Sequence, residues 1–194
     1  MVWSGTTHGN FSVKSAYYIL EKPPSQCYNG IYKKIWTWHG AEKIRVFLWQ
    51  SFNNRLPMNE WRSKWSSCSS LCQFCDSGTE NVLHIIRDCY YAKQIWLACI
   101  HPRYVTVFFS LTLKDWMSLN LKEDFDIERG SNWSNLWGVT CWLLWLWRNN
   151  FIFKYDYRKP GDPVAVIRLS LKLFSEVHDP AIGPPMSRPE RIKS

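Results

Sequence analysis

Apolar residues recur at helical spacing through most of the chain, and prolines or glycines interrupt the pattern. An amphipathic helix is expected to begin after Ser12, a residue type that caps helix N-termini well, and to end before Pro23. Further helices are expected over residues 31–38, 42–56, 59–65, 90–100, 113–119, 136–147 and 164–177. The pattern therefore predicts a mainly α-helical protein.

Two segments depart from helical spacing. Residues 2–4 and Phe11 flank a turn bounded by glycines, which predicts a small N-terminal hairpin. Residues 105–109 are β-branched and aromatic, so a short strand competes there with a buried helical segment. The apolar run 136–147 is shorter than the roughly 18 residues that a membrane span requires, and Arg148 follows it. We therefore expect a core helix there and no membrane partner.

The stretch from residue 72 to residue 89 carries the candidate chemistry. It has the pattern Cys-x2-Cys-x8-His-x4-Cys, made by Cys72, Cys75, His84 and Cys89. Thiolates and imidazole are ligands that zinc prefers, and four of them fill a tetrahedral shell with no position left for water. We expect a structural Zn²⁺. The alternative is a set of buried cysteines with a core histidine, but a hydrophobic core does not require such local clustering.

The spacing of the last two ligands imposes a geometric constraint. On an ideal helix His84 and Cys89 stand roughly 140° apart, so either the helix tightens or Cys89 lies just past its end. Gly78 permits the chain to reverse between the two halves of the motif, because glycine tolerates positive φ. Three other possible ligands are expected to be spectators, namely Cys68, Cys99 and His101.

Composition adds a few constraints. The 194 residues are enough for one domain or two small ones, and the 46% hydrophobic content with 13 Trp indicates a folded chain. The net charge of +8 favours contact with a polyanion, although such a charge is also common in proteins that never bind one. Seven cysteines without a recognisable secretory signal predict reduced thiols in an intracellular protein, with the nucleus as a candidate compartment.

Several motifs follow one another in an order that carries a family resemblance. They are residues 9–17, Ile35-Trp36, Lys43-Ile44, residues 47–49, residues 54–57, the four Cys and His positions, and Ala92 with Trp96. This series resembles the zinc-binding domain of plant LINE-type (non-LTR) reverse transcriptases, over roughly residues 3–96. The chain departs from the family pattern where Ala41 or Glu42 replaces a proline and where Met58 replaces a threonine.

The resemblance implies a domain organisation. In that family the zinc-binding domain follows the polymerase and often precedes a ribonuclease H domain. Residues 133–153, with Trp147-Arg148-Asn149, look like the connecting region, and residues 184–193 are similar to the lead-in to the ribonuclease H domain. We expect a zinc-binding domain over residues 1–100, a helical extension over 101–178 and a Pro-rich, disordered tail over 179–194.

Catalysis is not expected from this sequence. Polymerase and ribonuclease chemistry needs clustered carboxylates that hold divalent metals, and the chain has no adjacent Asp-Asp pair. The acid-rich stretch 122–128 is expected to be a solvated loop or helix start, and neither a Gly-rich phosphate loop nor a nucleophile elbow is present. The resemblance then implies a fragment or degenerate copy that kept the zinc module and lost both catalytic neighbours.

The expected function is that of a non-catalytic zinc-binding module of retrotransposon origin that associates with RNA or DNA. Four basic residues near the motif are expected to contact phosphate without reading sequence, namely Arg62, Lys64, Arg87 and Lys93. One alternative is a zinc-stabilised scaffold whose exposed tryptophans meet a protein partner. Another is a non-functional remnant of a polymerase and ribonuclease H polyprotein.

Overall fold

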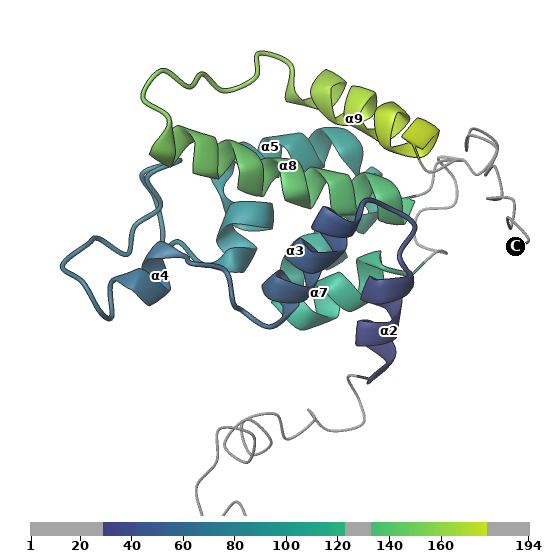
Figure 1. Cartoon of the computed structure of the whole chain (residues 1–194), viewed down its shortest axis with the longest axis horizontal. Coiled ribbons are helices and arrows are strands. Elements are labelled where there is room, and N and C mark those ends of the chain that lie inside the picture. The colour runs from purple at the N-terminus through teal and green to yellow at the C-terminus, as the bar shows by residue number, and fades with distance from the viewer. Residues whose placement is uncertain (1–28, 123–132, 178–194) are drawn as a thin grey trace, which may run out of the picture. The chain divides into compact units, whose positions relative to one another are not determined.

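The computed structural model describes residues 29–122 and 133–177. The predicted hairpin, the helix after Ser12, the acidic stretch beyond Lys122 and the Pro-rich tail lie outside the described residues. Internal contacts divide the chain into two units, Met1–Thr37 and Trp38–Ser194. Helices dominate the described residues, which confirms the predicted mainly α-helical class (Figure 1).

The described part of the first unit is helix α2 (Asn29–Thr37). Ile31 and Ile35, one helical turn apart, are buried, whereas Lys33 and Lys34 are exposed. The hydroxyl of Thr37 donates to the carbonyl of Lys33 at 2.9 Å and so satisfies one carbonyl of the last turn. This helix matches the one predicted from the apolar spacing over residues 31–38.

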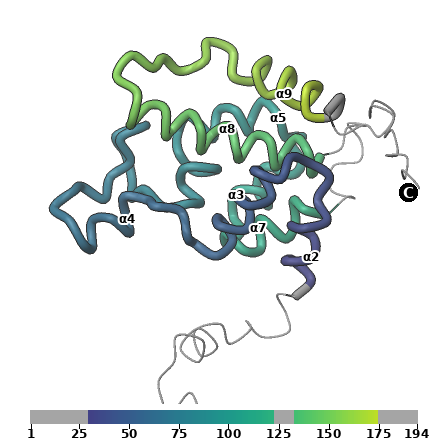
Figure 2. The backbone as a smooth tube through the Cα atoms, viewed as in Figure 1, coloured from purple at the N-terminus to yellow at the C-terminus, as the bar shows by residue number. Residues whose placement is uncertain are grey.

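The second unit is built from helices of different lengths, whose course Figure 2 traces. They are α3 (Glu42–Phe52), α4 (Asn59–Arg62), the π-helix η2 (His84–Asp88), α5 (Tyr90–Cys99), the 3₁₀-helix η3 (Pro102–Tyr104), α6 (Val105–Ser110), α7 (Leu113–Asn120), α8 (Trp133–Phe153) and α9 (Pro163–Val177). Within the described ranges extended pairing is limited to one isolated bridge, between Leu71 and Thr79.

Helix α8 is the central element of the second unit. It packs against α3, α7, α9 and η2, and α9 runs beside it in Figure 1. Trp137, Trp145 and Trp147 are buried on α8, as the prediction of a core helix required. In the described ranges, no helix combines the length and the apolar character needed to cross a membrane.

An aromatic cluster joins α5, α6, α7 and α8. Phe108 of α6 lies 5.1 Å from Trp96 and 5.2 Å from Trp116, measured between ring centroids. Trp116 in turn meets Trp137 edge-on at 5.2 Å, and Trp133 closes the cluster. Such edge-to-face pairs are favourable beyond their burial alone. Residues 105–110 form helix α6, so the helical alternative is confirmed and the strand is not formed. Phe108 of this helix is directed into the cluster.

Helix α3 is shorter than predicted. It ends at Phe52, whereas the apolar spacing suggested that it continues until Pro57 stops it. The side-chain amide of Asn53 donates to the carbonyl of Trp49 at 2.8 Å, and Asn54 adopts a φ of 52°. A left-handed residue ends a helix as effectively as a proline does, because the next N–H no longer points along the helix axis.

Trp38 connects the start of the second unit to α8. Its ring is buried and its Nε1–H donates to the carbonyl oxygen of Ser134 at 3.2 Å. A methyl group added at Gly138 would stand 2.6 Å from Cζ2 of this ring. The indole therefore lies directly on the α8 backbone, at a position where any side chain would displace it.

Candidate metal centre

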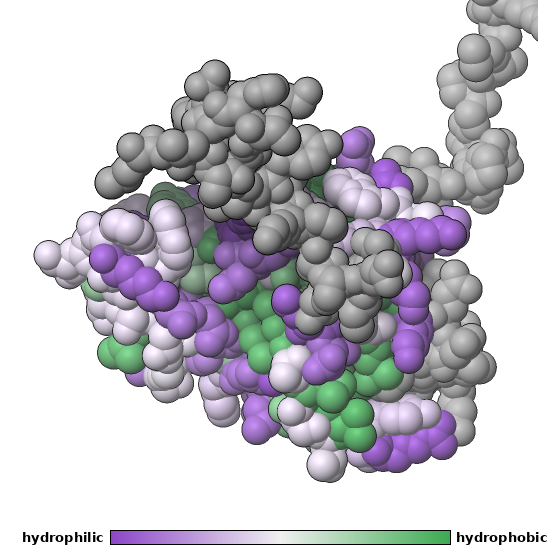
Figure 3. All heavy atoms as spheres, turned by 90° about the horizontal axis from the view of Figure 1, so that it is seen from below, coloured by the Kyte–Doolittle hydropathy of each residue, from purple (hydrophilic) through white to green (hydrophobic). Residues whose placement is uncertain are grey.

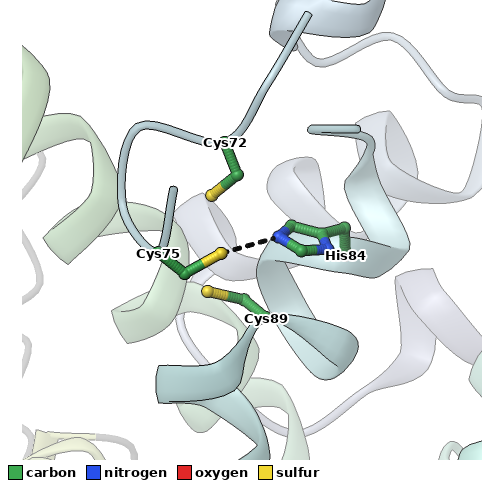
Figure 4. Close-up of side chains that lie close together, drawn as sticks. All are labelled: Cys72, Cys75, His84 and Cys89. Atoms are coloured by element: carbon green, nitrogen blue, oxygen red, sulfur yellow. Dashed lines mark hydrogen bonds between the residues drawn. The ribbon is translucent and has the colours of Figure 1, made fainter. Parts of the chain in front are cut away.

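The four predicted ligands meet in the structure. The sulfur atoms of Cys72, Cys75 and Cys89 and a ring nitrogen of His84 all lie within 4.8 Å of one another, and Figure 4 shows them pointing toward one another. Cys75 Sγ lies 3.3 Å from His84 Nε2. A tetrahedral zinc site, with Zn–S of about 2.3 Å and Zn–N of about 2.0–2.1 Å, has ligand-to-ligand edges of roughly 3.5–3.8 Å. The donor set and its spacing therefore fit zinc.

A tight reversal of the chain positions the first two ligands. The backbone N–H of Cys72 donates to the carbonyl of Gly78 at 3.1 Å, and that of Asp76 donates to the carbonyl of Cys72 at 2.8 Å. Asp76 and Gly78 have positive φ angles of 55° and 71°. The predicted role of Gly78 as the residue that permits the reversal is thereby confirmed.

A widened helical turn positions the other two ligands. Asn81 caps this turn, because its Oδ1 accepts the backbone N–H of His84 at 2.8 Å. The N–H of Cys89 then donates to the carbonyl of His84 at 2.6 Å, which is the i to i+5 bond of a π-helix. The first expectation, a tightened helix, is therefore wrong, because the helix widens into a π-turn. Cys89 lies just past its end, as the other expectation held.

The proximity of the ligands perturbs their protonation. Hydrogen bonding to Cys89, together with burial, raises the pKa of Cys72 to about 12. The same bond to Cys72 lowers the pKa of Cys89, and hydrogen bonding to Cys72 raises the pKa of His84 to about 9. Burial opposes ionisation of Cys75, but hydrogen bonding with Ser77 lowers its pKa. Cys72 and Cys89 therefore do not ionise together readily. A bound cation would favour the thiolate form of both.

Comparison with known proteins shows that the segment with these four residues belongs to a family. Residues 11–96, which include all four ligands, match the family model described as zinc-binding in reverse transcriptase. This segment is a reverse transcriptase zinc-binding domain. The module is of retrotransposon type, and the expected resemblance is confirmed.

One relative extends the likeness past this domain. The chain is 32% identical over 154 residues to an Arabidopsis thaliana protein named "Putative ribonuclease H protein", a match that covers 78% of this chain and 25% of that protein. The chain thus spans about a quarter of the length of the curated relative that it matches. No solved structure gives a significant match.

A buried ion pair ties the reverse transcriptase zinc-binding domain to α8. Arg148 donates from Nε to Oε2 of Glu80 at 3.2 Å and from Nη2 to Oε1, and both side chains are fully buried. The backbone N–H of Asn59 adds a bond to Oε1 of Glu80 at 3.0 Å. The loop between the second and third ligands is therefore anchored to two other elements. Sequence reasoning missed this pair, although an arginine directly after the apolar run 136–147 is a signal that it could have used.

Residues 72–89, which carry the four candidate ligands, are named the zinc-binding loop. An aromatic and cationic contact covers the first half of this loop. Phe74 is buried between Tyr91 and Phe151, with ring centroids 5.2 Å and 5.3 Å away. Lys159 donates from Nζ to the carbonyl of Phe74 at 2.9 Å and lies 4.0 Å from the centre of its ring. The segment after α8 thus returns to the loop and packs on it.

Three of the four basic residues expected to contact phosphate are exposed, namely Arg62, Lys64 and Lys93. Arg87 is buried instead. Its guanidinium donates to the carboxylate of Asp88 at 2.6 Å and to the carbonyl of Leu111 at 2.6 Å. A buried, paired guanidinium is not accessible to a phosphate, so the expectation for Arg87 is corrected to a structural role in joining η2 to the end of α6.

The expected spectators lie outside the four-residue cluster. Cys68 accepts a hydrogen bond from Ser66 at 3.0 Å, and Cys99 is buried on α5. His101 accepts the N–H of Arg103 at 3.3 Å and thereby caps η3.

Proposed function

We propose that this protein is a non-catalytic, zinc-stapled module that binds RNA or DNA through the phosphate backbone. The observation that carries the proposal is the convergence of four soft ligands within 4.8 Å, in a reverse transcriptase zinc-binding domain whose chain has a net charge of +8. Four protein ligands would complete a tetrahedral shell, so no coordination position remains for water or substrate.

The proposed role of zinc is structural. Cys72, Cys75, His84 and Cys89 would hold the ion, and the binding free energy would become folding free energy for a loop with little core of its own. Exposed Arg62 and Lys64 precede the segment of residues 65–71 that leads into Cys72, and exposed Lys93 lies on the helix that begins after Cys89. Fixing the loop would therefore also fix the segments that carry these cations.

Metal content tests the first half of the proposal. We expect one zinc ion per purified chain, measured by elemental analysis, and a loss of that ion when Cys75→Ser removes one ligand. The matched control is Cys68→Ser, which changes a nearby cysteine outside the cluster and should leave the zinc content unchanged. Full zinc content in the Cys75→Ser protein would contradict the site.

Salt dependence tests the second half. The logarithm of the binding constant for an oligonucleotide, measured by fluorescence anisotropy, should fall linearly with the logarithm of salt concentration, by about 0.7 to 0.9 per phosphate contact. Replacement of Arg62, Lys64 and Lys93 by glutamine should reduce that slope by roughly 2 to 3. Glutamines at the exposed residues Lys33 and Lys34 of α2 serve as the control. A flat salt response would contradict the proposal.

A second candidate function has its own supporting observation. Leu169 and Leu173, one turn apart on α9, are both exposed, and an exposed apolar strip is a feature of protein interfaces. In this alternative the metal only holds the helices together and the chain is a scaffold for a protein partner. Binding of that partner would be insensitive to salt and weakened by Leu169→Ser.

A further inference from the structure

Trp61 and Trp65 are unusual among the tryptophans of the described residues. They are 58% and 78% exposed, whereas most of the others lie in the core. Their ring centroids are 6.5 Å apart with an angle of 51° between the planes, so the two rings are tilted and do not cover each other by face-to-face stacking. Two adjacent exposed indoles forgo the free energy that burial of their apolar surface would contribute. Such an exposed aromatic patch is a feature of binding surfaces.

Basic residues alternate with these tryptophans. The segment reads Trp61-Arg62-Ser63-Lys64-Trp65, and both Arg62 and Lys64 are exposed. After Glu60, the sequence has no acidic residue until Asp76. A positive, aromatic surface of this composition is complementary to nucleotides, which combine flat π faces with negative phosphates.

The segment stands on a rigid base. The side-chain amide of Asn59 donates to the carbonyl of Leu71 at 3.1 Å, and the N–H of Glu60 donates to the carbonyl of Glu80 at 3.1 Å. The carbonyl of Arg62 accepts the N–H groups of Trp65 and Ser66, which continues the turn of α4 through the second tryptophan. The backbone that carries the two rings is therefore attached to the zinc-binding loop, which lowers the cost of ordering this segment on binding.

The surface view agrees with this composition. Figure 1 shows α4 on a lobe at the left of the second unit. The same lobe lies at the left in Figure 3, which is turned about the horizontal axis. Its surface in Figure 3 is coloured mainly in the pale and purple shades of intermediate and hydrophilic residues. These shades match the composition of residues 61–65, because tryptophan is intermediate and arginine and lysine are hydrophilic on this scale.

We infer that Trp61 and Trp65 stack on unpaired bases, while Arg62 and Lys64 neutralise the phosphates beside them. The inference rests on the proposed function and specifies its ligand as single-stranded nucleic acid. A duplex keeps the faces of its bases stacked on one another, so only an unpaired strand offers them to an indole ring. Stacking accepts any base, and the site therefore has no sequence preference.

The test compares a short single strand with a duplex of the same sequence, both dye-labelled, by fluorescence anisotropy at fixed salt. The Trp61→Ala/Trp65→Ala protein should bind the single strand roughly 10-fold to 100-fold more weakly than the wild type and bind the duplex equally well. Its zinc content and circular dichroism should be unchanged, because both side chains are exposed. Trp36→Ala, which removes an exposed tryptophan from α2, is the matched control and should bind as the wild type does.

The outcomes separate this inference from the proposed function. Equal single-strand affinity in the double variant and the wild type, with steep salt dependence in both, would overturn the stacking site and leave phosphate binding in place. Absence of binding by the wild type to either oligonucleotide would overturn both. In the Arg62→Gln/Lys64→Gln protein, a smaller salt slope for single strand and duplex alike would support the assigned roles of the two cations.

Discussion

At the scale of single residues, the zinc-binding loop depends on groups that are not ligands. Glu80 lies between the second and third ligands in the sequence, yet its carboxylate faces away to Arg148 on α8. Two charges removed from water are tolerated only when they are paired and hydrogen-bonded, as these are through Asn59 as well. The pair therefore sets where the loop docks.

Breaking this pair should be costly. In Glu80→Gln the charge of Arg148 stays buried without a counter-ion, and we expect the free energy of unfolding to fall by about 3–5 kcal/mol. Chemical denaturation followed by circular dichroism measures this change. The control Asp156→Asn alters an exposed acid and should change stability by less than about 0.5 kcal/mol. Unfolding midpoints that coincide in the two variants would refute the assigned importance of the pair.

Gly78 should be sensitive to the addition of a single methyl group. Its φ of 71° is strained for any other residue by about 1–2 kcal/mol, and an added Cβ would lie 3.3 Å from Cε1 of His84. We expect Gly78→Ala to weaken zinc binding roughly 5-fold to 30-fold, as measured by competition with a chromophoric chelator. Gly161→Ala adds the same methyl in open space and should bind zinc normally. Equal affinities in the two variants would show that the reversal tolerates a side chain.

At the scale of elements, the π-turn η2 matters because it brings His84 and Cys89 together. An α-helical turn places residue i+4 over residue i, whereas the i to i+5 bond of η2 places the fifth residue there. Such turns are rare, and this one coincides with two ligands. The ion and the unusual winding are therefore expected to stabilise each other.

Removal of the metal should consequently act on a defined part of the chain. With a chelator present, we expect the amides of residues 72–89 to lose protection in hydrogen–deuterium exchange, because the loop loses its cross-link. The amides of α8 should retain more of their protection, since this helix is buried against several others. Exchange in residues 72–89 that is indifferent to the chelator would argue against a structural ion.

Because Trp38 lies against α8, we expect Gly138→Ala to change the stability in the direction opposite to the usual one. Replacing a helical glycine by alanine normally stabilises a protein by roughly 0.5–1 kcal/mol. At Gly138, however, the added Cβ would stand 2.6 Å from the indole of Trp38, so we expect destabilisation by about 1–3 kcal/mol. Thermal unfolding followed by circular dichroism measures the sign, and a raised midpoint would contradict the close contact.

At the scale of the whole molecule, helices from both sides of residue 100 share one core. Helix α8 contacts α3 and η2, and the aromatic cluster joins α5 to α6, α7 and α8. A domain boundary at residue 100 stays a prediction from the sequence. The packing suggests that the region before this boundary depends on the helices after it.

Truncation provides the measurement. A fragment of residues 1–100 should be markedly less stable than the full chain, because it lacks Arg148, the partner of buried Glu80, and the α6 to α8 side of the aromatic cluster. The two proteins would be compared by denaturation with zinc bound. A fragment with the unfolding midpoint of the full chain would show that the zinc-binding domain folds independently of its extension.

The sequence by itself determined the features that depend on residues close together in the chain. Helical spacing predicted most helices of the second unit, and the Cys-x2-Cys and His-x4-Cys spacings identified four candidate ligands that the structure brings together. Local hydrogen bonds and the ligand spacing depend on neighbouring residues, which a linear pattern reveals. Asn54 marks a limit even here: asparagine favours the left-handed conformation that ends α3, but the apolar spacing continued past it and predicted an end at Pro57.

The tertiary structure decided the features that depend on distant residues. Arg87 and Arg62 look alike in the sequence, yet one is buried on Asp88 and the carbonyl of Leu111 and the other is exposed. Glu80 and Arg148 are 68 positions apart, and nothing local to either specifies the other. Burial and pairing of charges depend on which surfaces pack together, and spacing along the chain does not encode that choice.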